Sequence, residues 1–223
     1  MQLTQIQHPN IIKFIDYFVD NDICYLVTEL FGFTFNEELP QYSNHMKHST
    51  HTRPAMDLFE FIERNNRLSE SKTRYVFRQI LDAIAHLHSL GLVHRDVKDE
   101  NILLSADFQV KLIDFGSVSF YNKNQKLHFS RFLGTIQYAS PEILLGQSYN
   151  GPAAEIWQLG CCLYIMLTGQ VPFSSAKNVI SSNFAQVKVP LTDTCIGLIH
   201  GMLEKDPELR LTLEQVSNHP WLF

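Results

Sequence analysis

The sequence is short of cysteine, of positive charge and of long apolar runs, and each shortage excludes a class of protein. Its four cysteines show no Cys-x-x-Cys spacing, so a disulfide framework is not indicated and a reducing compartment is expected. The longest apolar run, from Cys161 to Leu167, is far too short to cross a bilayer. A formal net charge of −5 offers no broad basic face. We expect a soluble cytoplasmic protein, with a nuclear location as the alternative, that binds neither nucleic acid nor membrane.

Enough apolar material is present to build a core. Hydrophobic residues make up 45% of the 223 residues and charged residues only 18%, which is typical of a folded chain. Short β-like runs with a turn between them occupy residues 1–31, a polar stretch without periodicity occupies 32–56, and 57–223 is mainly helical in pattern. We predict an α+β fold with these three parts, in which only a few strands precede a large helical region.

One long amphipathic helix is the clearest predicted element. Ser69 is suited to an N-cap and Gly91 to a C-cap. Apolar residues recur between them at helical spacing: Val76, Ile80, Ile84 and Leu87. Short apolar pieces at 92–93, 102–104 and 110–113 follow, and further helices are predicted around 154–169, 192–204 and 212–218.

The polar stretch contains three histidines at a spacing that suggests a metal site: His45, His48 and His51. No acidic or cysteine partner stands at a ligand-like spacing. We therefore favour a solvated loop over metal binding.

The residues that carry chemistry come from two loops. The run HRDVKDEN at 94–101 follows the long helix, and the run Asp-Phe-Gly at 114–116 follows a short strand. Together they supply two carboxylates, an amide and an ammonium. That set suits phosphoryl transfer from a metal-bound nucleotide, because a carboxylate can accept a hydroxyl proton while another holds Mg²⁺.

In this order and context the motifs resemble those of a eukaryotic serine/threonine protein kinase, and the alternative of an ordinary polar turn is disfavoured. The resemblance implies a kinase-like fold whose C-lobe is mainly helical and which carries only the last strands of the N-lobe. It implies ATP and Mg²⁺ as cofactors, with Asp96 as catalytic base and Lys98 on the phosphate side. Asn101 and Asp114 would be the Mg²⁺ ligands, and Arg95 would link to the activation segment.

Two later motifs agree with this resemblance. The run GTIQYASPE at 134–142 resembles the substrate-docking loop of kinases, and Thr135 with Lys98 favours Ser or Thr as the acceptor in protein substrates. Glu142 would pair with Arg210, because a buried carboxylate without a partner would cost several kcal/mol.

Within the kinases, the chain resembles the PAS kinases near the calcium/calmodulin-dependent group. Asp99 stands where Pro is usual, and Glu155 stands where an aspartate normally anchors the catalytic loop. The resemblance places both acids in PAS kinases too. We expect the longer Glu155 side chain to reach the backbone near Arg95.

The resemblance also assigns a nucleotide pocket. Thr28 would be the gatekeeper, and Glu29 to Phe31 the hinge. Leu103 would pack beneath the adenine. Asp57 would meet the ribose or a basic substrate residue, with a plain first-turn helix acid as the alternative.

Several other residues receive expected roles. His94 and Phe115, beside Gly116, would belong to an apolar column that aligns the two lobes. Arg131 occupies the place where many kinases carry a phosphorylated threonine, with Ser130 beside it, so we expect activity without phosphorylation there. Glu100 and Asp57 would attract basic substrate residues, whereas Ile165 stands where some relatives carry a second acid.

The sequence departs from an active kinase at its start. None of its ten glycines forms Gly-x-Gly-x-x-Gly, and no strand resembles Val-Ala-Ile-Lys. We therefore expect an N-terminally truncated kinase domain with impaired activity, since catalysis of this kind rests on positioning and electrostatics. The alternative is a non-catalytic, pseudokinase-like interaction module that docks a partner near Thr135.

Overall fold

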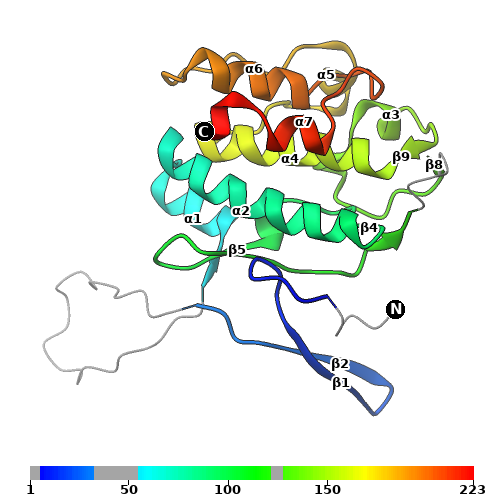
Figure 1. Ribbon diagram of the computed structural model, residues 1–223. Coiled ribbons are helices and arrows are strands. Elements are labelled where there is room, and N and C mark those ends of the chain that lie inside the picture. The colour runs from blue at the N-terminus through cyan, green and yellow to red at the C-terminus, as the bar shows by residue number, and fades with distance from the viewer. Residues whose placement is uncertain (1–5, 33–54, 122–127) are drawn as a thin grey trace, which may run out of the picture.

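The computed structural model describes residues 6–32, 55–121 and 128–223. The helices of this part of the chain are α1 Leu58–Asn65, α2 Glu70–Ser89, α3 Pro141–Leu144, α4 Gly151–Thr168, α5 Ala176–Ser181, α6 Asp193–Met202 and α7 Leu213–Ser217. Figure 1 shows them in layers, with α1 and α2 below, α4 in the middle, and α6 and α7 above. The site described below lies where the loops between these layers meet.

The strands are short and pair antiparallel. They are β1 Phe14–Asp20, β2 Ile23–Thr28, β3 Met56–Asp57, β4 Leu92–Val93, β5 Ile102–Leu104, β6 Val110–Leu112, β7 Ser119–Phe120, β8 His128–Phe129 and β9 Tyr149–Asn150. Within the described residues β3, β5 and β6 form a three-stranded sheet, and the pairs β1–β2, β4–β7 and β8–β9 form separate ribbons. The N-terminal segment joins the sheet through a parallel bridge between Ile11 and Leu112.

Helix α2 confirms the prediction made for it. The Ser69 hydroxyl accepts from the Lys72 amide, and Gly91, with a φ of 71°, follows the last turn. The four apolar residues predicted for its inner face, from Val76 to Leu87, are fully buried. The later helices lie where they were predicted, with ends shifted by one to three residues. Helix α5 was missed because it is short and buries only Val179.

Helix α4 is the centre of the core. Its residues are buried on every side, since α2 packs against one face and α6 against another. Fully burying one large apolar side chain stabilises a fold by about 1.5–3 kcal/mol, so this helix holds much of the stability. None of the helices in the described ranges is both long enough and apolar enough to cross a membrane.

The two described ends of the polar stretch lie next to each other. The amide of Ala55 donates to the carbonyl of Phe31 at 2.9 Å, and Met56 then pairs with Leu104 as the edge of the sheet. The predicted histidine-rich loop, with His45, His48 and His51, lies outside the described residues.

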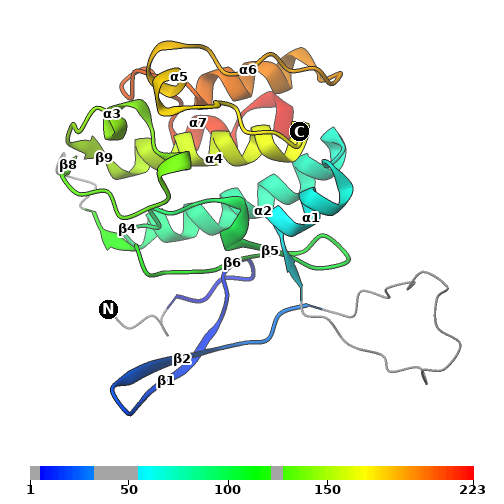
Figure 2. The ribbon, with the colours of Figure 1, turned by 180° about the vertical axis from the view of Figure 1, so that it is seen from behind.

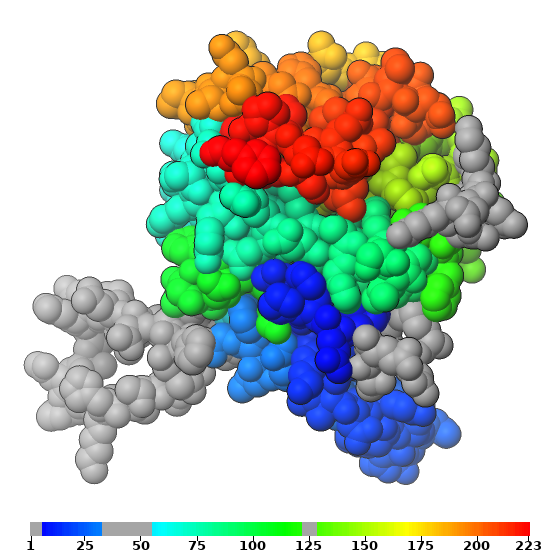
Figure 3. Space-filling model, in the orientation of Figure 1, coloured from blue at the N-terminus to red at the C-terminus, as the bar shows by residue number. Residues whose placement is uncertain are grey.

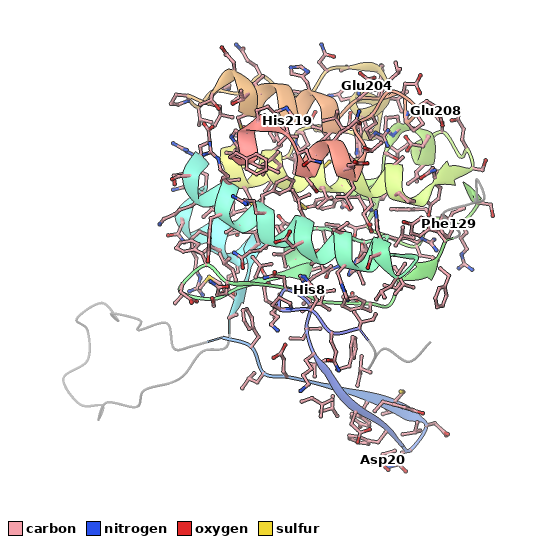
Figure 4. All side chains as sticks on the ribbon, in the orientation of Figure 1. His8, Asp20, Phe129, Glu204, Glu208 and His219 are labelled. Atoms are coloured by element: carbon pink, nitrogen blue, oxygen red, sulfur yellow. The ribbon has the colours of Figure 1, made fainter. Side chains whose placement is uncertain are left out.

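The β1–β2 hairpin stands apart from the helical body (Figure 3). Asn21 and Asp22, both with positive φ, form its two-residue turn, as the sequence indicated. Figure 4 shows Asp20 beside this turn at the far tip of the ribbon. Many of its apolar residues are exposed: Ile15, Tyr17, Phe18, Val19, Ile23, Tyr25 and Leu26.

Candidate active site

The 94–101 loop is anchored by Glu155 of α4. The carboxylate Oε1 accepts from the backbone amides of His94 at 2.7 Å and Arg95 at 3.0 Å, which confirms the expected reach to this backbone. Its Oε2 lies 2.5 Å from Nε2 of His88, at the end of α2. Burial would raise the pKa of Glu155, but these partners outweigh it and lower the pKa.

A second residue of α4 fixes the same loop. The Gln158 side chain accepts from the Val97 amide at 3.1 Å and donates to the Arg95 carbonyl at 3.1 Å. Arg95 has a φ of 71°, a conformation that costs a non-glycine residue of order 1 kcal/mol. Glu155 and Gln158 together hold the strained backbone in place.

These contacts present Asp96 to the surface of the site. Its Oδ1 accepts from the Thr135 amide at 2.7 Å, and its Oδ2 accepts from Nδ2 of Asn101 at 3.2 Å. The ammonium of Lys98 lies 3.9 Å from Oδ2 and 2.6 Å from Glu100. Partial burial lowers the pKa of Lys98, but the hydrogen bond with Glu100 and the charge of Asp96 outweigh burial and raise this pKa. The loop thus brings the carboxylate of Asp96 next to an ammonium and to the backbone of Thr135.

Asn101 and Asp114 come together through the sheet. The amide of Ile113 donates to the Asn101 carbonyl at 3.0 Å. The loop that leads into β5 and the loop that leaves β6 therefore lie side by side, because the two strands are antiparallel. The Asn101 Nδ2 also donates to the Asp96 carbonyl at 2.8 Å, which leaves its Oδ1 as the atom for a ligand. Asp114 has a φ of 59°, and its Oδ1 accepts from the Gly116 amide at 3.1 Å.

These two oxygen donors fit Mg²⁺. Magnesium prefers carboxylate and carbonyl oxygens and usually keeps waters and phosphate oxygens as its other ligands. No group of three or more His, Cys, Asp or Glu side chains suited to a metal occurs among the described residues. The pair of Asp114 and Asn101 therefore suits a metal that arrives with phosphates better than a fully protein-bound one.

An aromatic stack joins the hairpin to the loops. Phe115 meets the ring of His94 at 5.2 Å and the ring of Phe14 at 5.5 Å, both edge to face. His94 Nε2 bonds to the Ile113 carbonyl, and burial lowers the pKa of His94. The structure thus brings together the members of the predicted apolar column and adds Phe14.

The predicted nucleotide residues lie around the sheet and hairpin. Thr28 ends β2, and Glu29 accepts from the Lys13 amide at 2.9 Å and pairs with Lys111 at 2.6 Å. Burial raises the pKa of Glu29, but Lys111 and the Lys13 amide outweigh burial and lower this pKa. Phe31 lies 5.7 Å from the Lys111 ammonium. The ion pair ties the segment after β2 to β6.

Leu103 and Asp57 pair across the sheet edge. Leu103 is half-buried at the centre of β5. Asp57 caps α1, since its Oδ1 accepts from the Glu60 amide at 2.7 Å. The structure therefore gives Asp57 the helix-terminal role that the sequence left as the alternative.

The 114–142 segment is fastened without a phosphate. Arg95 donates to the Ser119 hydroxyl at 2.7 Å and to the Arg131 carbonyl at 2.6 Å. Its guanidinium also lies 4.5 Å from the centre of the Phe129 ring, which Figure 4 labels at the β8 end of the molecule. Tyr149 donates to the same Arg131 carbonyl at 3.2 Å. The Arg131 carbonyl thus accepts hydrogen bonds from both Arg95 and Tyr149.

The far end of this segment is locked by a buried ion pair. Arg210 donates to both oxygens of Glu142 at 2.9 and 3.0 Å, as predicted. The same guanidinium donates to the Ala153 carbonyl at 2.8 Å. Because all its donors are used, removing either partner would leave a buried charge uncompensated.

Besides Phe14, sequence reasoning missed four residues of this site. His88, Gln158 and Lys111 support the loops and the hinge, and Tyr138 donates to Asp99 at 2.6 Å. His88 lies on the apolar face of α2, where a lone polar residue could have signalled a buried partner. No local pattern marks the other three.

The comparisons agree with this geometry. A family model described as "Protein kinase domain" matches residues 1–222, so the chain belongs to the protein kinase family. Membership implies the use of ATP, typically with a divalent metal ion, and of protein substrates.

Among its relatives, the chain is 36% identical over 222 residues to the PAS domain-containing serine/threonine-protein kinase of Mus musculus, covering 99% of the chain and 14% of the relative. It is 37% identical over 216 residues to serine/threonine-protein kinase ppk6 of Schizosaccharomyces pombe, covering 96% and 24%. It is 35% identical over 223 residues to serine/threonine-protein kinase SIK2 of Gallus gallus, covering 97% and 25%. The chain thus spans about a quarter or less of these relatives.

Proposed function

We propose that this chain is the part of a protein kinase that transfers the γ-phosphoryl group of ATP to Ser or Thr hydroxyls of protein substrates. The observation that carries the proposal is the convergence of Asp96, Asn101 and Asp114 at the ends of two adjoining strands. The names of the relatives, all serine/threonine-protein kinases, support the same reaction. No contact in the described residues favours the non-catalytic interaction module, and neither does the name of any of these three relatives.

Asp96 is the base that receives the proton of the acceptor hydroxyl. Its carboxylate is held by the Thr135 amide and the Asn101 side chain, so its orientation is set before substrate arrives. Thr135 also lines the groove beside the loop, which places the acceptor chain next to the base. Lys98 screens negative charge at the same point.

Asp114 and Asn101 would hold Mg²⁺ through their carboxylate and amide oxygens. Bound there, Mg²⁺ would supply positive charge that stabilises the negative charge developing on the transferred phosphoryl group. The chain's own part is to fix the two ligands, through the Asp96 carbonyl for Asn101 and the Gly116 amide for Asp114.

The adenine would lie between the hinge and the sheet. Thr28, Glu29 and Phe31 form one side of this region, and Leu103 of β5 the other. The Glu29–Lys111 pair keeps the hinge strand against the sheet and so preserves the width of the site. Protein substrates would be met in the cytoplasm or the nucleus.

The test is phosphoryl transfer from labelled ATP to a mixture of Ser and Thr peptides with the whole 223-residue chain. Asp96→Asn keeps the shape of the side chain but removes the base, so transfer should fall by about 10²–10⁴-fold while thermal unfolding is unchanged. Asp82→Asn, an exposed change on α2, is the matched control and should behave as wild type. Equal transfer by Asp96→Asn would overturn the assignment.

Activity is also predicted to be independent of phosphorylation at residue 130. Arg95 is already bound to the Arg131 carbonyl, so no phosphate is needed to hold the 114–142 segment. Ser130→Ala should retain the wild-type rate in the same assay. Loss of transfer in Ser130→Ala, with the fold intact by circular dichroism, would contradict this prediction.

A further inference from the structure

A groove lies beside Asp96 and is not explained by the nucleotide site. It has a volume of about 400 Å³ and is lined by α1, the 94–101 loop, residues 135–138 and the end of α4. Figures 1 and 2 both place α1 below the C-terminal end of α4, so the groove lies between two fixed helices. Its lining includes Thr135, whose amide binds Asp96. A chain lying in it would therefore pass the base.

The walls of this groove are of mixed character. Phe59, Ile62 and Ile165 give it apolar surface, and Glu63, Asp99 and Glu100 are its acidic residues. Among the residues that the structure describes, no lysine, arginine or histidine lines it. An apolar wall with carboxylates and no cations suits a side chain with an aliphatic stem and a cationic head.

Two acids that the sequence suggested for basic substrates are already engaged. Asp57 caps α1 through the Glu60 amide, and Glu100 pairs with Lys98 at 2.6 Å. Ile165 offers no charge at the position where relatives can carry an acid. The cation-binding role therefore has to fall to another residue of the groove.

Asp99 has the properties that this role requires. It is only 4% exposed, and no lysine or arginine in the described part of the chain forms an ion pair with it. Its Oδ1 accepts from the Tyr138 hydroxyl at 2.6 Å and from the Glu100 amide at 3.0 Å, and neither bond uses Oδ2. Tyr138 lines the groove as well, so the carboxylate is held in a fixed orientation at its edge.

We propose that Asp99, held by Tyr138, is the specificity-determining residue that binds an arginine side chain of the substrate close to the acceptor hydroxyl. The proposal rests on the proposed function, because it takes the groove as the substrate site. Arginine fits better than lysine, since a planar guanidinium can bond a carboxylate while it stacks on Phe59 or Tyr138.

The first experiment needs no variant. Fluorescein-labelled Ser peptides carrying arginine at each position around the acceptor are compared with peptides carrying citrulline, a neutral isostere, by fluorescence anisotropy with the whole chain. At one position arginine should bind about tenfold more tightly than citrulline, because a desolvated charge pair is lost. Equal binding of both series at every position would overturn the proposal.

Variants then assign the effect. Asp99→Asn should reduce the preference at that position to about twofold or less, and Tyr138→Phe, which keeps the charge but removes its donor, should reduce it partly. Glu60→Gln, on α1 but outside the groove lining, is the control and should keep the full preference. If Asp99→Asn fails to fold, Tyr138→Phe with an unchanged arginine preference still counts against the proposal.

Binding and transfer are measured separately, so the two proposals can fail separately. Arginine preference that depends on Asp99 without any phosphoryl transfer would sink the proposed reaction and leave this groove assignment standing. Phosphoryl transfer to peptides without any arginine preference would refute the groove assignment and leave the proposed reaction standing. A preference that persists in Asp99→Asn but is lost in Glu63→Gln would move the role to α1 and refute the assignment to Asp99.

Discussion

At the scale of single residues, the site depends on a few buried side chains that order a polar loop. Glu155 satisfies two backbone amides and a histidine at once, and Gln158 satisfies an amide and a carbonyl. A glutamate here reaches one carbon further than an aspartate would. His88 takes up the second oxygen, so the longer side chain remains fully bonded.

Replacing Glu155 by glutamine should destabilise the chain by about 3 kcal/mol, because buried donors are left with a weaker or missing acceptor. Urea unfolding followed by tryptophan fluorescence at pH 7 measures this. Glu60→Gln at the surface should change stability by no more than about 0.5 kcal/mol. A similar small effect for Glu155→Gln would show that the anchor contributes little.

Glu155 also leads to a prediction of how stability changes with pH. The folded pKa of Glu155 is lowered, so its contribution is complete above the ordinary glutamate pKa and is lost as pH falls below it towards the folded value. The ionised side chain of Asp99 contributes to stability with the opposite sign. Its pKa is raised in the folded state, so its ionisation destabilises the fold at neutral pH. Stability profiles of Glu155→Gln should therefore be flatter than wild type on the acid side, and a profile of equal slope would contradict this.

At the scale of elements, the helices are joined by tight connections that tolerate little change. Helix α4 ends at Gly169, which has a φ of 71°, and a Cβ there would lie 2.0 Å from the Asn66 carbonyl oxygen. The turn between α1 and α2 also bonds to α4, since the Leu68 amide donates to the Met166 carbonyl at 2.8 Å. The end of one helix and the start of another are thus fitted together through backbone atoms.

Gly169→Ala should destabilise the chain by at least about 2 kcal/mol, since a strained φ and a backbone clash add. Gly197→Ala is the matched control. It lies on α6 with nothing within 4 Å of the added carbon, so it should stabilise by about 0.5–1 kcal/mol. Thermal unfolding of both variants distinguishes these signs, and a stabilised Gly169→Ala would rule out the clash.

Much of this arrangement could be read from sequence, and the remainder has a physical cause. Helix α2 was predictable because its apolar spacing, its N-cap serine and its glycine agree. The site residues in the two loops were predictable because their order is specific. The bond between the side chains of Tyr138 and Asp99 joins residues 39 positions apart, and no periodicity records such a contact. For Asp57 the sequence left two roles open, and only the contact with the Glu60 amide shows the cap.

At the scale of the whole molecule, two regions differ in how they are held. The helical body surrounds α4. The hairpin and the segments at its two ends contact this body through Phe14, the bridge at Ile11 and the ion pair between Glu29 and Lys111. The side chains proposed to be catalytic belong to the body, and the proposed hinge directly follows β2 of the hairpin. The proposed nucleotide site therefore depends on the joint between the two regions.

Nucleotide binding by these 223 residues is predicted to be weak. The sequence has no Gly-x-Gly-x-x-Gly loop and no strand resembling Val-Ala-Ile-Lys, so the triphosphate meets only the side of the site formed by the two loops. We expect calorimetry to give a dissociation constant for Mg·ATP above about 1 mM. A constant of that size corresponds to a binding free energy of roughly −4 kcal/mol. Asp114→Asn should abolish any dependence on Mg²⁺, and micromolar binding by the wild-type chain would contradict the prediction.

The placement of the two tryptophans has a practical consequence. Trp157 stacks on Phe173 with ring centres 5.4 Å apart, and Trp221 donates to Glu70 at 2.8 Å. Both are shielded inside the helical body, while the hairpin carries the tyrosines Tyr17 and Tyr25. Tryptophan fluorescence therefore reports the unfolding of the helical body and not that of the β1–β2 hairpin. A denaturation curve recorded by tryptophan fluorescence can look two-state even when the hairpin has already detached from the body.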